Sequence, residues 1–342
     1  MKEIVNRKKI FIAGGSGSLG SALIRRLGYE NELIIFSRDE SKHWTIKNNN
    51  KDKNLIFEVG DIRDENRIKE VLLRHRPNII LIAAALKHVD TCELSPYESI
   101  QTNITGTRNI VNAVETDLER LLPDLESVLM VSTDKACAPV NVYGMCKSIS
   151  ERLVVSRSHF FDKPKFLATR YGNVLESRGS IIPLFKHQAN HAKAFTLTHK
   201  DMTRFVMTLD DSIDLIQHAL IYGESGQTWI PKLKSMKILD LAKIFSKRYD
   251  KPVEVIGMRP GEKIHESLIC DAESVRVLKK EDHYIIMSQH KPVSPDAVMF
   301  EYTSADDVFS LEALEEHLNK LGVVDLSLDS FVGKRIEEIR ED

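Results

Sequence analysis

The sequence predicts an α/β fold, in which a doubly wound parallel sheet is followed by a smaller C-terminal lobe. Three observations predict it. Short, almost continuously apolar segments alternate with stretches of helical periodicity, a glycine-rich turn follows the first apolar segment, and the alternation weakens after about residue 171. Parallel strands are buried on both faces and are therefore apolar along their length, and their alternation with helices is typical of a doubly wound sheet.

Six apolar segments are predicted to be the strands of this sheet, and they span residues 9–14, 32–37, 55–60, 78–84, 127–132 and 165–170. Apolar residues recur with the helical period in "SALIRRLGY" and "ENRIKEVLLRH", which lie between predicted strands. We therefore expect a first domain over residues 1–170 and a lobe over 171–290, some of whose segments return to the first domain. Residues 291–342 are expected to form an arm that includes a helix at "SLEALEEHLNKL".

Composition and charge argue against several classes of partner. The 342 residues carry a formal net charge of −2 with basic and acidic residues interleaved, so we expect neither a nucleic-acid nor a membrane partner. The N-terminal segment has no apolar signal core, and no apolar run approaches the roughly 20 residues of a membrane helix. Four cysteines show neither a CxxC pairing nor a metal-ligand spacing. We therefore expect a cytoplasmic protein with reduced thiols and no metal site.

The glycine-rich turn is "AGGSGSLGSALI", which lies directly between the first predicted strand and the first predicted helix. Glycine allows the backbone to turn tightly and to approach a pyrophosphate, whose charge is then stabilised by the helix N-terminus. An ordinary flexible turn is the alternative, but the strand–turn–helix context favours a dinucleotide site of the Rossmann type. The loop residues expected to hold the dinucleotide are Gly14, Ser16, Gly17, Ser18, Leu19 and Gly20.

The end of the second predicted strand indicates which dinucleotide is bound. There "FSRDESK" places Ser37 and Arg38 first, Asp39 next and Lys42 close behind. A guanidinium and an ammonium group can pair with the 2′-phosphate of NADP. NADP is therefore the expected cofactor, although Asp39 leaves NAD open, because an acid at this position can hold a ribose hydroxyl. Asp61 and Ile62, after the third strand, are expected to border the adenine ring.

The segment "STDKACAPVNVYGMCK" concentrates groups that donate or accept protons. Thr133, Asp134 and Lys135 follow the fifth predicted strand, at the carboxyl edge where open α/β sheets bind ligands. Tyr143 and Lys147 lie one helical turn apart at the start of the next predicted helix. The Lys147 ammonium and the positive cofactor ring would favour the tyrosinate, so Tyr143 is a candidate base. For Asp134 and Lys135 the alternative is a structural ion pair.

Taken together, these motifs resemble those of the extended short-chain dehydrogenase/reductase family. The resemblance becomes more specific when the order of the motifs along the chain is considered. This order is similar to that of the soluble UDP-N-acetylglucosamine 4,6-dehydratases, most closely the inverting enzymes of polysaccharide and pseudaminic acid biosynthesis. The motifs are, in order, "SRDE", "AAALKHV", "TNITGT", "STDKACAPVNVYGMCK", "RYGNVLESRGSIIPLF", "MTRF", "PKLKSMKILDLAK" and "RPGEKIHESL". The resemblance covers roughly residues 8–270.

The resemblance implies a hydro-lyase that converts UDP-N-acetylglucosamine to a UDP-2-acetamido-2,6-dideoxy-4-hexulose, with inversion at C5. Bound NADP would take a hydride from C4 and return it to C6. The implied catalytic residues are Thr133, Asp134, Lys135, Tyr143 and Lys147, with Asp134 as the acid for the departing C6 hydroxyl and Lys135 as the base at C5. A homo-oligomer is also expected.

The remaining site residues are implied by their positions in the same motifs. NADP is expected to be held also by Ala83, Lys87, Thr102 and Val174. The substrate is expected to be held by Lys87, Asn173, Arg178, Gly179, Ser180, Ile181, Ile182, Thr198, Arg204, Arg259 and Glu262. His265 is expected to be structural. Guanidinium groups suit a diphosphate, and a carboxylate can accept hydrogen bonds from ribose hydroxyls.

Several alternatives remain open from the sequence. The first is a dehydratase that retains the C5 configuration or acts on a GDP- or dTDP-linked sugar. The second is a sugar-nucleotide 4-epimerase, which needs Tyr143 and Lys147 but no acid–base pair at 134–135. The third is an NADP-binding protein without catalytic activity, which would bind the cofactor without turnover.

Overall fold

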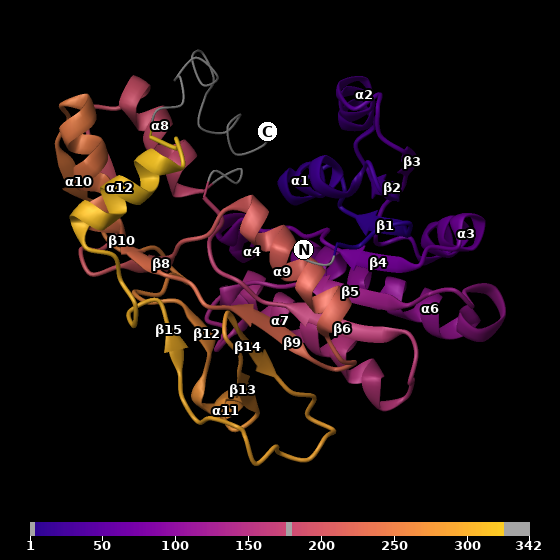
Figure 1. The fold of residues 1–342 in the computed structure, drawn as a ribbon. Coiled ribbons are helices and arrows are strands. Elements are labelled where there is room, and N and C mark those ends of the chain that lie inside the picture. Colours follow the sequence, from indigo (N-terminus) through magenta and orange to yellow (C-terminus); the bar gives the residue numbers. More distant parts are fainter. Residues whose placement is uncertain (1–3, 176–179, 325–342) are drawn as a thin grey trace.

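The computed structural model describes residues 4–175 and 180–324, apart from the side chains of residues 117–121. Its centre is a nine-stranded sheet in the order β13-β14-β9-β6-β5-β4-β1-β2-β3 (Figure 1). Pairing is parallel from β3 to β9 and antiparallel from β9 through β14 to β13. The strands are β1 (Lys9–Ala13), β2 (Glu32–Ser37), β3 (Leu55–Val59), β4 (Ile79–Ile82), β5 (Ser127–Val131), β6 (Lys165–Thr169), β9 (Thr228–Pro231), β13 (Val277–Lys279) and β14 (His283–Ile286). The predicted doubly wound sheet is confirmed, and each predicted strand contains one of β1 to β6.

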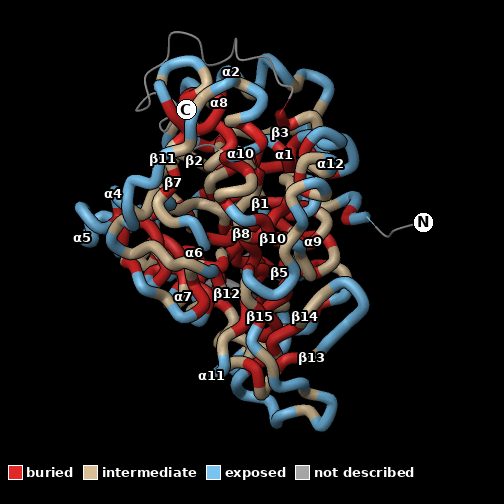
Figure 2. The backbone as a smooth tube through the Cα atoms, turned by 90° about the vertical axis from the view of Figure 1, so that its left-hand side faces the viewer, coloured by how far each residue is buried: buried red, intermediate tan, exposed pale blue. Residues whose placement is uncertain are grey.

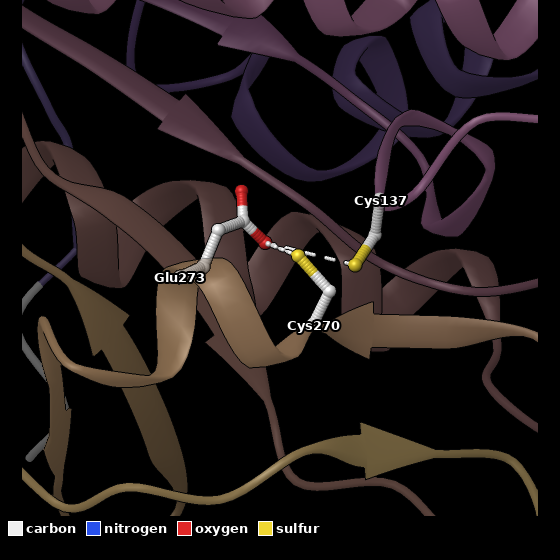
Figure 3. Close-up of side chains that lie close together, drawn as sticks. All are labelled: Cys137, Cys270 and Glu273. Carbon is white, nitrogen blue, oxygen red and sulfur yellow. Dashed lines mark hydrogen bonds between the residues drawn. The ribbon is translucent and has the colours of Figure 1, made fainter.

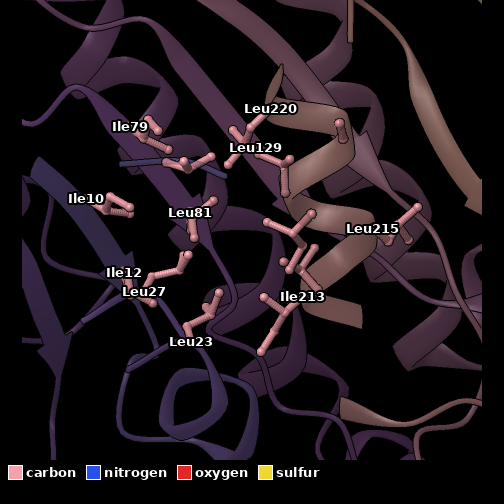
Figure 4. Packing of buried hydrophobic residues seen from close by; sticks show 14 of the residues in the cluster. Ile10, Ile12, Leu23, Leu27, Ile79, Leu81, Leu129, Ile213, Leu215 and Leu220 are labelled. Atoms are coloured by element: carbon pink, nitrogen blue, oxygen red, sulfur yellow. The ribbon is translucent and has the colours of Figure 1, made fainter. Parts of the chain in front are cut away.

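Helices cover both faces of this sheet. One face packs against α1 (Ser18–Leu27) and α9 (Leu209–Tyr222), and the other against α3 (Glu65–His75), α6 (Gly106–Leu121) and α7 (Val142–Val155). Successive strand residues alternate between the two cores: Ile10 and Ile12 join Leu23 and Ile213 on the first face, as Figure 4 shows, whereas Phe11 joins the second. Because both faces are buried, these strands need apolar side chains at every position. Figure 2 shows the buried strands inside a shell of exposed loops.

A smaller lobe has a separate apolar core. It consists of α8 (Ile181–His191), α10 (Ile238–Tyr249), α12 (Leu311–Lys320) and the strand pairs β7 (Phe195–Leu197) with β11 (Val253–Val255) and β8 (Thr203–Phe205) with β10 (Ser235–Lys237). Phe185, Phe195 and Phe245 pack against one another at its centre, with ring centroids 5.4–5.8 Å apart. The predicted helix near residue 311 is confirmed as α12, and its Leu314 and Leu318 are buried in this core.

The chain after residue 171 contributes to both parts of the molecule. β9, β13 and β14 extend the main sheet, and α9 covers it, whereas α8 and α10 belong to the lobe. The boundaries at residues 170 and 290 therefore remain a prediction about domains. Among the described residues, no helix is both long and apolar enough to cross a membrane.

The remaining elements are helices, helical turns and one strand pair. They are α2 (Glu40–Asn49), α4 (Val89–Leu94), α5 (Pro96–Ser99), the π-helix η1 (Ile100–Thr105), the 3-10 turns η2 (Asp134–Ala136) and η3 (Ser156–His159), α11 (Asp271–Ser274), and the strand pair β12 (Ser267–Ile269) with β15 (Tyr302–Thr303). The strand pair matters for the site, because β12 packs against η2.

Candidate active site

The glycine-rich turn connects β1 to the N-terminus of α1. Gly14 has a positive φ of 84° and donates its N–H to the carbonyl of Phe36, on β2, at 2.9 Å. A Cβ on Gly20 would lie 2.0 Å from the carbonyl oxygen of Gly15, so only glycine allows helix and turn to approach this closely. Gly17 is the N-cap of α1, Ser16 lies in the turn before it, and Ser18 and Leu19 are the first residues of the helix. These residues form the kind of backbone cradle that fits a dinucleotide pyrophosphate.

The residues predicted to select the cofactor follow β2. Asp39 caps α2, since its Oδ1 accepts from the backbone N–H of Lys42 at 2.9 Å, and this hydrogen bond is the main reason that its pKa is lowered. Lys42 Nζ also lies 3.4 Å from Asp39 Oδ2. Arg38 is 58% exposed, with Nη1 3.6 Å from Asp61 Oδ2. The Asp39 carboxylate, which could favour NAD, thus caps a helix, whereas the Arg38 guanidinium, which could favour NADP, is largely exposed to solvent.

The other predicted cofactor residues are distributed around the same edge. Ser37 Oγ lies 2.7 Å from His43 Nε2, and Ile62 is buried. Ala83 follows β4, Lys87 is exposed in the next loop, and Thr102 is buried in η1. Val174 forms an isolated bridge to Met207.

Local sequence places the predicted catalytic residues on two adjoining elements. Thr133 is the N-cap of η2, which carries Asp134 and Lys135 directly after β5. Tyr143 and Lys147 lie on the first turns of α7, whose N-cap Asn141 accepts from the Gly144 N–H at 2.8 Å. A Cβ on Gly144 would lie 2.2 Å from the carbonyl oxygen of Lys135, so glycine is needed where η2 touches α7.

The charges around Tyr143 differ in part from the prediction. Burial raises the pKa of Tyr143 to about 12, and the positive charge of Lys135 offsets this rise. Burial lowers the pKa of Lys147 to about 8, and its ammonium donates to the carbonyl of Val131 at 2.6 Å. Lys135 is therefore a cation favouring the tyrosinate that the sequence did not predict, and the same role for Lys147 stays a prediction.

A second carboxylate, which the sequence reasoning missed, completes the cluster. Lys135 Nζ lies 3.1 Å from Asp134 Oδ1 and 3.2 Å from Glu266 Oε1, and Glu266 Oε1 lies 3.7 Å from Nε of Arg204. Thr133 Oγ1 also donates to Asp134 Oδ1 at 2.9 Å. Glu266 directly precedes β12 and belongs to the motif "RPGEKIHESL". In the sequence, Glu266 could be recognised only as a charged residue next to an apolar segment. Its neighbour His265 contacts Thr203 Oγ1 through Nδ1 at 2.8 Å, as expected of a structural histidine.

Burial and mutual charge determine the protonation of this cluster. Burial raises the pKa of Asp134. Burial opposes the charge on Lys135, but Asp134 and Glu266 outweigh it and raise the lysine pKa. Burial likewise acts to raise the pKa of Glu266, but Lys135 and Arg204 lower it. Asp134 Oδ2 and Glu266 Oε2 are buried and have no hydrogen-bond partner among the described residues. Buried oxygens of this kind are costly unless a ligand or water satisfies them, so the cluster is a candidate functional site.

A pocket in the lobe brings together most of the predicted substrate residues. Its wall includes Asn173, Val174, Ser180, Ile181, Thr198, Arg204, Arg259 and Glu262. Ile182 is fully buried in the lobe core and Lys87 is outside the pocket wall, while the predicted Arg178 and Gly179 lie outside the described residues. Apolar side chains that the sequence reasoning did not select, such as Leu184 and Met236, line the rest.

The two pocket arginines are held differently. Arg204 donates from Nη1 to the carbonyls of Thr203 and Ile264 at 2.7 and 3.1 Å, so its guanidinium is fixed between the pocket and Glu266. Arg259 is 40% exposed, and its Nη1 lies 3.6 Å from Asp90 Oδ2. Its backbone N–H donates to Glu262 Oε2 at 3.0 Å. One arginine is therefore preorganised, and the other can still turn towards an anion.

Comparison with known proteins establishes the family. Residues 10–288 match the model of the family described as "Polysaccharide biosynthesis protein". The chain belongs to this family. A relative from Rickettsia rickettsii, named UDP-glucose 4-epimerase, is 37% identical over 82% of this chain and 82% of its own. The solved structure of Pen from Bacillus thuringiensis is 30% identical, covers 93% of this chain and 99% of its own, and superposes with a TM-score of 0.84.

A more distant structure shows the same fold. It is the dTDP-glucose 4,6-dehydratase DesIV from Streptomyces venezuelae, solved with NAD and TYD bound, which is 20% identical to this family member with a TM-score of 0.64. The superposition covers 75% of this chain and 86% of DesIV. At this identity the likeness concerns the fold alone.

Proposed function

We propose that the protein is an NADP-dependent nucleotide-sugar 4,6-dehydratase that acts on UDP-N-acetylglucosamine and inverts C5. One observation carries this proposal: Lys135 is held between two buried carboxylates, Asp134 and Glu266, beside Tyr143. Oxidation and reduction at C4 alone need only the tyrosine and the cofactor. Loss of the C6 hydroxyl also needs an acid, and removal of the C5 proton needs a base, so an additional acid–base cluster supports dehydration.

NADP would be held at the glycine-rich turn, where it would supply a group able to accept a hydride from the sugar and to give it back. The helix N-terminus and the close approach at Gly14 and Gly20 fit its pyrophosphate. Tyr143 would take the proton of the C4 hydroxyl. Its pKa of about 12 already includes the lowering by the Lys135 charge, so it must fall further for this step, and a positively charged ring nearby would act in that direction.

The cluster then divides the proton transfers of the elimination. Asp134 is suited to hold a proton for the departing hydroxyl, because burial raises its pKa. Lys135 must be a neutral amine to act as base at C5, yet its pKa is raised. Its proton therefore has to pass to a carboxylate, and Asp134 Oδ1, 3.1 Å away, is the better acceptor because its pKa is raised, whereas the pKa of Glu266 is lowered. We propose Glu266 as a positioning residue that holds Lys135 from the other side at 3.2 Å.

The lobe pocket would hold the nucleotide diphosphate. Arg204 and Arg259 supply guanidinium groups for phosphate, and Asn173 Oδ1 is buried without a partner among the described residues. Arg204 also approaches Glu266, so the pocket and the acid–base cluster share one rigid link. This continuity supports a substrate that extends from diphosphate in the lobe to sugar at Tyr143.

A 4-epimerase is the second candidate function, because the relative from Rickettsia rickettsii is named as one. An epimerase would return the hydride to C4 and release a product isomeric with the substrate. The NAD in the DesIV structure likewise makes NAD the alternative cofactor. The exposed Arg38 and the helix-capping role of Asp39 favour NADP here.

One experiment separates these candidates. The full-length protein is incubated with UDP-N-acetylglucosamine and, in parallel, with GDP- and dTDP-linked sugars, and the products are analysed by mass spectrometry and NMR. A product lighter by one water, with C6 reduced and C5 inverted, is expected, without net accumulation of NADPH. A product of unchanged mass with an inverted C4 would establish the epimerase instead, and cofactor binding without turnover of any sugar would contradict both.

A further inference from the structure

Two cysteines that are far apart in sequence converge beside the acid–base cluster (Figure 3). Cys137 follows η2 directly, and Cys270 follows β12. Both thiols donate to the same oxygen of Glu273, Oε2, at 3.6 and 3.4 Å. The two sulfurs and this carboxylate all lie within 4.8 Å of one another. The spacing of these cysteines along the chain did not suggest any pairing.

A metal ion fits this cluster poorly. Arg170 is buried and forms a bidentate ion pair with Glu273, at 2.7 and 2.8 Å, so both carboxylate oxygens are already engaged. The guanidinium also places a fixed positive charge beside the site, and Glu151 holds that guanidinium from its other side at 2.6 Å. Binding a divalent cation would require this buried ion pair to break, which is strongly unfavourable. The two sulfurs remain the reactive part of the cluster.

We propose that Cys137 and Cys270 form a reversible disulfide when the protein meets a peroxide. Cys270 is partly exposed and Cys137 is buried, so a small oxidant can reach Cys270 while Cys137 stays protected behind it. When the Cys137 thiol turns its single hydrogen from Glu273 to Cys270, this hydrogen bond lowers the pKa of Cys270 to about 7, although burial and the negative charge of Glu273 act against ionisation. Cys270 therefore ionises first, and Cys137 is positioned to respond.

The chemistry balances with hydrogen peroxide as the oxidant. The Cys270 thiolate attacks one peroxide oxygen, the O–O bond breaks, and a sulfenic acid forms as hydroxide leaves and is protonated to water. The Cys137 thiol then attacks the Cys270 sulfur and loses its proton, the S–O bond breaks, and the departing hydroxide takes up that proton, so that the disulfide and a second water are formed. Two thiols and one peroxide are thereby converted to one disulfide and two waters.

The disulfide would reach the active site through the backbone. An S–S bond needs the sulfurs about 2 Å apart, so closing it draws the segment after η2 towards the segment after β12. Those segments continue directly into Asp134 and Lys135 on one side and Glu266 on the other. A misplacement of about 1 Å at a catalytic group can cost on the order of 10²-fold in rate. Oxidation is therefore expected to lower turnover, and reduction to restore it.

The test uses the full-length protein, first reduced and then treated with hydrogen peroxide. Peptide mass spectrometry should find Cys137 and Cys270 joined, and thiol titration should show two of the four cysteines lost and then regained with dithiothreitol. Cys137→Ser and Cys270→Ser should each abolish the cross-link. Cys92→Ser and Cys146→Ser, which alter the other two buried thiols, should retain it.

The cross-link and its effect on turnover are measured separately. If the protein does not catalyse the proposed dehydration, the mass-spectrometric test for the Cys137–Cys270 cross-link can still be interpreted. Over-oxidation of Cys270 to sulfinic acid in the unaltered protein, without a cross-link to Cys137, would overturn the proposal. So would retention of one zinc per chain that only a chelator releases and that protects both thiols. A cross-link in the unaltered protein would support it even if one serine variant failed to fold.

Discussion

The charges predicted to select the cofactor and those predicted to transfer protons lie in opposite environments. Arg38 and Lys42 are 58% and 36% exposed, and each has one carboxylate neighbour at more than 3 Å. The Asp134 and Glu266 side chains are 1% and 4% exposed, and both contact Lys135. Exposed charges are screened by water and salt and contribute little to folding, whereas a buried charge depends on its fixed partners.

This difference in exposure separates the residues predicted to select the cofactor from those predicted to transfer protons. The exposed cations are free to turn towards a 2′-phosphate and gain a partner when it binds. The buried cluster already has its partners, so substituting one member leaves another charge unpaired in a medium that solvates it poorly. Substitutions in the cluster should therefore have large effects on turnover, and substitutions at the cofactor edge should change mainly affinity.

The largest effect is expected from Tyr143→Phe compared with Lys135→Ala. Removing the Tyr143 hydroxyl should block oxidation at C4 and every later step. Lys135→Ala retains Tyr143 and Lys147, so C4 oxidation should survive in part, while water loss falls on the order of 10²–10⁴-fold, as for one positioned acid–base group. Transient nicotinamide reduction and exchange of solvent deuterium into C5 distinguish the two. If Lys135→Ala eliminates water at the unaltered rate, Lys135 is only a structural partner of Asp134.

A smaller loss, on the order of 10²-fold in kcat, is expected for Glu266→Gln, because the amide no longer holds the lysine in place. The substitution removes one of the charges that raise the pKa of Lys135, so the apparent pKa of the base limb should move to lower pH. The pH profile of kcat measures this shift.

The matched control for Glu266 is Glu262→Gln, at a pocket residue that lies in the same motif. It should raise KM for the sugar nucleotide with little change in the pH profile. A fall in kcat for Glu266→Gln without any shift in pH dependence would indicate a purely structural role for Glu266.

At the cofactor edge, Arg38→Ala should weaken NADP binding by roughly 10- to 100-fold, since charged hydrogen bonds contribute about 1.5–3 kcal/mol. NAD binding should change little, because NAD has no 2′-phosphate. Titration with both dinucleotides measures the ratio. Arg25→Ala, an exposed arginine on α1 that pairs with Asp210, is the control. Full NADP preference in Arg38→Ala would show that another group binds the phosphate.

The smallest effect concerns stability at Lys42. Its ion pair with Asp39 is exposed, and the backbone hydrogen bond that caps α2 survives the substitution. Lys42→Ala should therefore change the free energy of unfolding by less than about 1 kcal/mol in urea denaturation. A loss of several kcal/mol would mean that this edge is as tightly coupled as the buried cluster, and the comparison would fail.

Much of the fold was predictable because its signals are local. Strands buried on both faces are apolar throughout, so β1 to β6 are visible in short windows of sequence. Gly20 approaches the nearby Gly15, and the cap at Asn141 acts on Gly144, so the turn and the start of α7 depend on local sequence. Only the later part of the chain, where β9, β13 and β14 rejoin the sheet, required the tertiary structure.

The sequence by itself determined the doubly wound sheet, the glycine-rich turn and the position of Tyr143 and Lys147 one turn apart on a helix, since each rests on residues within about one helical turn or one strand. Only the tertiary structure decided that Glu266 meets Lys135, and that Cys270 meets Cys137, because β12 packs against η2 across more than a hundred residues of chain. It also decided where the Lys147 ammonium points. Such contacts depend on how elements pack together, and the pattern within each element does not contain them.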